Sequence, residues 1–165
     1  MRIELCHRFE GARLDEVESL YLLDDEFNRE VFARLGYERE VVRATRTGDR
    51  LRRTLRVHAR GAIPAPFSAL VPASAFHFDE HTEYDFAQHR GTWRTVPSVL
   101  EKQFHSGGTF SIVDEEWAVS FRLEGEATAH LPLIGGRAER QAVATALKNH
   151  EAIAEAARAR LHVKT

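Results

Sequence analysis

Two charged side chains fall at positions where the pattern of this sequence predicts apolar ones. Arg53 alternates with aliphatic residues, and Glu80 alternates with aromatic residues, in segments with the period of a β-strand. A buried charge is costly unless it is paired, so the two side chains are candidates to pair with each other or to anchor the head group of a ligand. The alternative, which the sequence favours, is that both lie near a rim with their charged ends in water.

A third polar residue interrupts the apolar stripe of a long carboxyl-terminal helix. His150 lies between Leu147 and Ile153 on that stripe, where its imidazole could contact a bound molecule or act as an acid or base. The favoured alternative is a packed core histidine, because no nucleophile or orienting carboxylate is evident near it. We therefore assign no catalytic residue.

The segment 77–85 carries side chains with metal-binding donor atoms on one face of a predicted strand. These side chains are His77, Asp79, His81, Glu83 and Asp85. Residues two apart on a strand diverge over about 7 Å, so a tight site would need ligands from elsewhere. A solvated outer face explains the pattern more simply, and we expect no metal and no cofactor.

Aromatic residues dominate the predicted inner face of the sheet, whereas the helix stripe opposite is rich in alanine. This excess of aromatic area predicts a pocket for a hydrophobic small molecule, although a solid core is the alternative. The expected ligand-binding residues are Phe78, Trp93, Phe104, Trp117, Phe121, Ala146, His150, Arg53 and Glu80.

The elements that must position these residues follow from periodicity and from breaks at Gly and Pro. Strands are expected at residues 3–9, in two runs on either side of 47–49, and at 76–86, 93–96, 100–112 and 117–131. Two short helices follow the first strand, and a long helix spans about 136–161. The prediction is a single α+β domain, residues 1–165, in which a curved seven-stranded antiparallel sheet wraps around the last helix.

Two local features are also predicted. The segment 64–73 is rich in proline yet apolar, which favours a loop or short helix that packs as a lid or plug and controls entry to the pocket. A β-bulge is expected at Gly107 and Gly108.

Composition excludes several classes of protein. Acidic and basic residues nearly balance at a net charge of −2, which argues against nucleic-acid binding. Cys6 is the single cysteine, and neither a secretory signal nor a transmembrane stretch is evident, so a cytoplasmic location is expected. No phosphate-binding loop, nucleophile elbow or paired-histidine zinc motif is present.

The junction between the last strand and the last helix is more specific. Residues 132–139, PLIGGRAE, are similar to the PLxGGxxE junction of a functionally uncharacterised bacterial branch of the START-like superfamily, whose fold is also called helix-grip. The order of elements resembles that superfamily over the whole chain. Its members commonly enclose an apolar ligand between sheet and helix; some transfer lipids or bind hormones, and some cyclise polyketides. They share no catalytic motif, so the resemblance implies a cavity and no particular reaction.

The resulting hypothesis is binding or transfer of a lipid-like or polycyclic hydrophobic molecule, more consistent with a non-enzymatic protein than with an enzyme. One alternative is a cyclase, aromatase or hydrolase that acts on such a molecule in the same cavity. The other is a protein-interaction module with a filled core.

Overall fold

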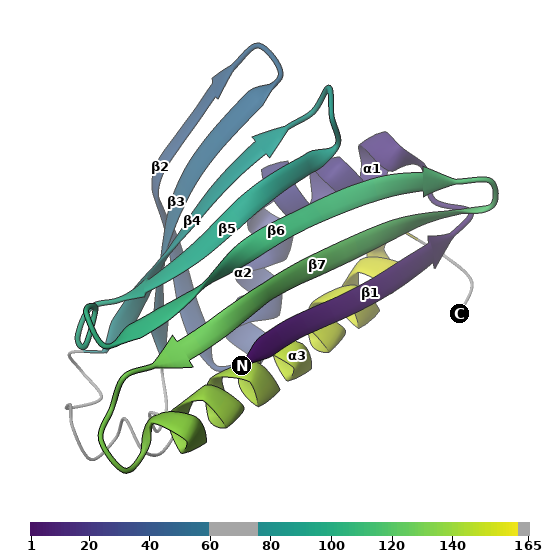
Figure 1. Cartoon of the computed structure of the whole chain (residues 1–165). Helices are drawn as coiled ribbons and strands as arrows, with labels where there is room; N and C mark the ends of the chain where they lie inside the picture. The colour runs from purple at the N-terminus through teal and green to yellow at the C-terminus, as the bar shows by residue number, and fades with distance from the viewer. Residues whose placement is uncertain (60–75, 162–165) are drawn as a thin grey trace.

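The structure is a computed structural model that describes residues 1–59 and 76–161. Within these residues, seven strands form one antiparallel sheet in the order β1-β7-β6-β5-β4-β3-β2, so all neighbours except β1 and β7 are consecutive in sequence (Figure 1). The strands are β1 (Arg2–Glu10), β2 (Tyr37–Thr47), β3 (Arg50–Ala59), β4 (His77–Asp85), β5 (Arg90–Pro97), β6 (Phe104–Glu115) and β7 (Ala118–Ala129). The predicted α+β fold with a curved antiparallel sheet is confirmed.

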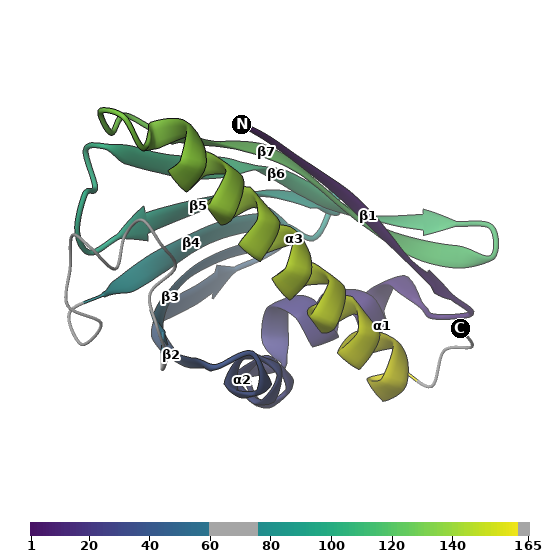
Figure 2. The same ribbon diagram turned by 90° about the horizontal axis from the view of Figure 1, so that it is seen from below.

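The helices all lie on one face of the sheet, which curves around the long helix α3 (Figure 2). They are α1 (Leu14–Glu18), the π-helical turn η1 (Ser19–Leu23), α2 (Asp25–Arg34) and α3 (Gly135–Arg160). The first three form the predicted pair of short helices after β1, because α1 and η1 are continuous. Among the described residues, no helix combines the length and the apolar composition that a membrane span requires.

Alternate side chains of β6 and β7 point to the same face of the sheet and form the core beneath α3. Val119, Phe121 and Leu123 of β7 are buried, as are Phe110 and Ile112 of β6. A slip of one residue in either strand would turn these groups outward, which is why the alternation in the sequence predicted the register well.

Three glycines allow β5, β6 and β7 to approach closely. A Cβ atom at Gly125 would lie 2.7 Å from Cζ2 of Trp93, and one at Gly108 would overlap the carbonyl oxygen of Glu124. The predicted bulge at Gly107 and Gly108 is wrong, because the pairing of β6 with both neighbours runs through these residues without a shift. The glycines serve close approach instead.

The amino-terminal end of α3 is fixed to the last strand. The carboxylate of Glu139 accepts a hydrogen bond of 2.9 Å from the backbone N–H of Ala129, and Ala138 is fully buried. Hydrogen bonding to Ala129 is also the main reason that the pKa of Glu139 is lowered. The junction that stood out in the sequence therefore sets where α3 begins to cross the sheet.

Candidate ligand cavity

A cavity of about 460 Å³ lies between α3, the inner face of the sheet and the short helices. Residues from β2 through β7 line one side of it, and Ala142, Ala146 and Ile153 of α3 line the other. The cavity lies where the sequence predicted space, between the aromatic face of the sheet and the alanine-rich side of α3. The volume falls within the usual range for small-molecule sites, roughly 300–1,000 Å³.

The structure brings most of the predicted ligand-binding residues together at this cavity. Those that line it are Arg53, Phe78, Glu80, Trp93, Phe104, Phe121, Ala146 and His150. They come from β3 to β7 and from α3, which are adjacent in the sheet or packed across it.

Trp117 is the exception, and its predicted place on the inner face is wrong. Its side chain is 79% exposed in the turn that joins β6 to β7. Trp117 has the same parity as Phe121, but β7 begins only at Ala118, and alternation no longer fixes the direction of a side chain once the strand has ended.

Stacked rings form the apolar wall of the cavity. Phe121 stacks on Tyr21 of η1 with ring centroids 4.8 Å apart, and it stacks on Phe110 at 5.8 Å. The indole nitrogen of Trp93 and the hydroxyl of Tyr21 are buried and have no hydrogen-bond partner among the described residues. The wall is therefore aromatic with single unpartnered donors, a composition typical of binding sites.

His150 faces this wall from α3. Its imidazole stacks on Phe121 at a centroid distance of 6.0 Å, and its Nδ1 is buried without a partner in the described part of the chain. Burial, with a smaller contribution from the charge of His7, lowers the pKa of His150 to about 4. The ring is therefore neutral at physiological pH and offers one donor and one acceptor nitrogen.

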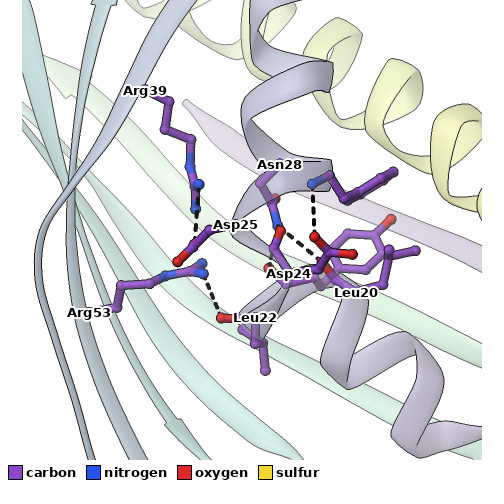
Figure 3. Close-up of polar contacts among 9 residues, drawn as sticks. Leu20, Leu22, Asp24, Asp25, Asn28, Arg39 and Arg53 are labelled. Atoms are coloured by element: carbon purple, nitrogen blue, oxygen red, sulfur yellow. Dashed lines mark hydrogen bonds and ion pairs between the residues drawn. The ribbon is translucent and has the colours of Figure 1, made fainter.

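Arg53 is buried at the opposite side of the cavity, only 7% exposed, contrary to the favoured expectation that its charge lies in water. Its Nη1 donates a hydrogen bond of 2.7 Å to the carbonyl oxygen of Leu22 in η1 (Figure 3). Its Nε has no partner within the described residues. Burial and the nearby charge of Arg39 lower the pKa of Arg53 to about 10, so the guanidinium stays charged at neutral pH.

Arg39 is a second buried arginine of the cavity, and sequence reasoning missed it. It is 6% exposed, and both Nε and Nη2 are buried without a partner in the part of the chain that the structure describes. Its Nη1 lies 3.6 Å from the carboxylate of Asp25 in α2, a weak contact. In the register of β2 and β3, Arg39 lies opposite buried Val57 and faces inward with it, and the sequence of β2 by itself carries no signal of this.

Glu80 also lines the cavity, but it does not pair with Arg53 as considered from the sequence. In the register of β3 and β4 it lies opposite Leu55, whereas Arg53 lies opposite Thr82. Its carboxylate forms no ion pair with a described residue. Glu80 nevertheless opposes the lowering of the pKa of both arginines through its charge.

The short helices that receive these arginines are held by polar contacts. Asp24 caps α2 by accepting a hydrogen bond of 2.9 Å from the backbone N–H of Phe27. Asn28 donates to the carbonyl oxygens of Asp24, at 2.8 Å, and Leu20, at 3.0 Å (Figure 3). These bonds satisfy the irregular backbone of η1 and fix its carbonyl groups beside the cavity.

The candidate metal-binding face of β4 is occupied by contacts within the sheet. Asp79 forms a bidentate pair with Arg56 at 2.8 and 2.9 Å, and His81 Nδ1 lies 3.1 Å from the hydroxyl of Thr54. In the described residues, no group of three or more His, Cys, Asp or Glu side chains is placed to hold a metal ion. The predicted lid, residues 64–73, lies outside the described residues.

The sequence matches the family described as "Protein of unknown function (DUF2505)" over residues 8–161. The chain belongs to this family. No curated protein has a sequence that matches it.

Solved structures of other proteins resemble this member of the DUF2505 family in fold, among them the following three. TTHA0849 from Thermus thermophilus is 18% identical with a TM-score of 0.66, and the match covers 98% of this chain and 97% of that one. Ms6760 from Mycobacterium smegmatis is 13% identical with a TM-score of 0.59, covering 97% and 90%. A conserved protein from Geobacillus kaustophilus is 12% identical with a TM-score of 0.53, covering 100% of both chains. At these identities the likeness concerns the fold alone.

Proposed function

We propose that this DUF2505 protein binds or transfers a lipid-like or polycyclic hydrophobic molecule in the cavity beneath α3. The observation that carries the proposal is the cavity of about 460 Å³ between an aromatic sheet and an alanine-lined helix. Interiors are normally close-packed, so retained space of this size with aromatic walls favours an occupant over a solid core. The resemblance of residues 132–139 to the junction of START-like proteins supports the same function, and membership of that superfamily is part of the proposal.

The test is binding of Nile red, a neutral apolar dye, followed by its fluorescence. We expect saturable binding by the wild type. Ala146→Phe places a ring in the cavity and should weaken binding at least about tenfold. Ala144→Phe is the matched control, because Ala144 is exposed on the same helix and does not line the cavity. That variant should bind the dye as the wild type does.

The possible outcomes distinguish whether the protein binds an apolar molecule from where it binds it. Absence of saturable binding by the wild type would contradict the proposed function. Equal binding by the two phenylalanine variants would leave a binding protein whose site is elsewhere. Native mass spectrometry of the protein isolated from its own cells would then identify the natural occupant by comparing gentle with denaturing conditions.

The cyclase, aromatase or hydrolase alternative depends on His150, whose Nδ1 is unpartnered within the described residues and lies at the cavity. Its pKa of about 4 makes it a weak base at neutral pH, where effective general bases have pKa values near 7. Binding without catalysis is therefore the better-supported function. Loss of turnover of a polycyclic or ester substrate in His150→Ala, with dye binding preserved, would reverse this ranking.

A further inference from the structure

Two guanidinium groups are buried at the same side of the cavity, and each has N–H groups without an acceptor among the described residues. Nε and Nη2 of Arg39 and Nε of Arg53 are buried N–H donors with no acceptor among the described residues. A buried donor without a partner costs free energy, and the cost is larger for a charged group. These atoms therefore indicate a site that is built to receive an acceptor.

The acceptors that the described part of the chain supplies do not meet this demand. The carbonyl oxygen of Leu22 takes one bond from Arg53. The side chain of Asp25 is 54% exposed and approaches only Nη1 of Arg39, at 3.6 Å. Glu80 lines the cavity but forms no ion pair with a described residue, so it lowers the local positive charge without satisfying the open donors.

The two guanidinium charges are also close enough to disfavour each other. After burial, the charge of Arg39 is the largest cause of the lowered pKa of Arg53, and the opposing effects of Glu80 and Asp25 are each smaller. Both groups nevertheless remain protonated at neutral pH. An anion beside them would satisfy the donors and relieve the repulsion together.

Sheet order places this charged region away from the aromatic wall. Arg39 and Arg53 lie on β2 and β3 beside η1 and α2, as Figure 3 shows, whereas Phe104 and Phe121 lie on β6 and β7. Strands β4 and β5 separate the two pairs of strands. The two buried guanidinium groups thus lie at one side of a cavity that is otherwise largely aromatic, with Arg39 5.6 Å from the centre of the Phe32 ring, and this suits a molecule with one ionised end and one apolar end.

We propose that the occupant is an apolar carboxylic acid whose carboxylate binds Arg39 and Arg53. This inference rests on the proposed function. A carboxylate only accepts hydrogen bonds, and its two oxygens match the planar fork of a guanidinium. An alcohol brings a donor to a region already rich in donors, and an amine adds a third positive charge.

The test compares dodecanoic acid, methyl dodecanoate and dodecylamine as competitors of Nile red at about pH 8, where the acid is ionised. We expect the acid to compete at least about tenfold more strongly than the ester, with the amine weakest. Equal competition by acid and ester would overturn the carboxylate proposal and leave the proposed function standing. Failure of Nile red itself to bind would contradict the proposed function instead.

Substitutions locate the anion site. Arg39→Met and Arg53→Met retain an apolar stem and remove the charge, so in each variant dodecanoic acid and methyl dodecanoate should compete about equally, whatever the affinity of that variant for Nile red. Arg52→Met is the control, because the Arg52 side chain on β3 is exposed and pairs at the surface with Glu83. An unchanged preference in both buried-arginine variants would contradict the proposed site.

Glu80→Gln provides an independent test in case the arginine variants do not fold. It removes the negative charge that lines the cavity beside the arginines and leaves a side chain of the same shape. We expect its affinity for dodecanoic acid, relative to that for methyl dodecanoate, to rise on the order of threefold. Weaker binding of the acid in this variant would overturn the inference.

Discussion

The hydroxyl of Tyr84 donates a hydrogen bond of 2.7 Å to the carboxylate of Glu18, which joins the inner face of β4 to α1. Both residues are buried, and Nδ1 of His89 lies 2.8 Å from the same carboxylate oxygen. Burial and the bond to Glu18 raise the pKa of Tyr84 well above its usual value, so the phenol stays protonated and donates. The contact therefore holds α1 against the sheet.

Tyr84→Phe should destabilise the protein by about 1–3 kcal/mol, because it removes a donor from a buried carboxylate. Urea unfolding at neutral pH measures the change. Tyr37→Phe is the control, since the Tyr37 hydroxyl has only a long contact of 3.5 Å with Asn149, and its loss should be smaller. If the two substitutions lowered the free energy of unfolding equally, the hydrogen bond from Tyr84 to Glu18 would not stabilise the protein.

Acid should destabilise the protein through His150. Its pKa of about 4 in the folded state lies below the ordinary value of 6.5, so the unfolded chain takes up a proton first. Stability from the buried neutral ring is complete above pH 6.5 and declines as the pH falls towards 4, by up to about 3 kcal/mol.

His150→Phe keeps a ring against Phe121 and removes this titration. Denaturant unfolding between pH 7 and pH 4.5 should show a shallower fall in the free energy of unfolding than in the wild type. The pKa of His7 is also lowered by burial, and His7 is retained in both proteins, so only the smaller part of its effect that acts through His150 differs between them. Parallel pH profiles would contradict the buried, neutral state of His150.

Gly108→Ala should be strongly destabilising. The new methyl group would meet the carbonyl oxygen of Glu124 in the backbone of β7, which cannot move without breaking the ladder. We expect a loss of about 1–3 kcal/mol, typical of overpacking. Gly136→Ala is the control, because in α3 the nearest atom to its Cβ is the flexible end of Arg140 at 3.7 Å, and it should be neutral or stabilising. Thermal unfolding of the two variants checks both signs.

Asp24→Ala should cost about 1 kcal/mol by removing the cap of α2. Asp24→Asn keeps an acceptor oxygen for the N–H of Phe27 and should cost much less. Hydrogen exchange of the α2 amides and the free energy of unfolding measure the effect. If Asn were as harmful as Ala, the negative charge near the helix dipole, and not the cap, would be the stabilising feature.

Alternation along β6 and β7 predicted the inner face because burial on one side leaves a period of two in the sequence. The same period placed Trp117 wrongly, because it does not mark where a strand ends. Arg39 escaped notice for a different reason. Most of β2 is exposed and rich in arginine, and what buries Arg39 is a helix earlier in the chain, which periodicity within the strand does not reveal.

The strand order also governs when the molecule can be assembled. Every other neighbouring pair of strands is consecutive along the chain, but β1 pairs with β7. Glu10, for example, can pair only once Ala118 has been brought to it from the far end of the chain. Hairpins from β2 to β7 can form locally, whereas β1 has no sheet partner until the far end of the chain is in place. Closing so long a loop is slow. The edge that supports α3 is therefore completed last, and α3 and β1 should become protected together in refolding, after the strands that form the charged side of the cavity.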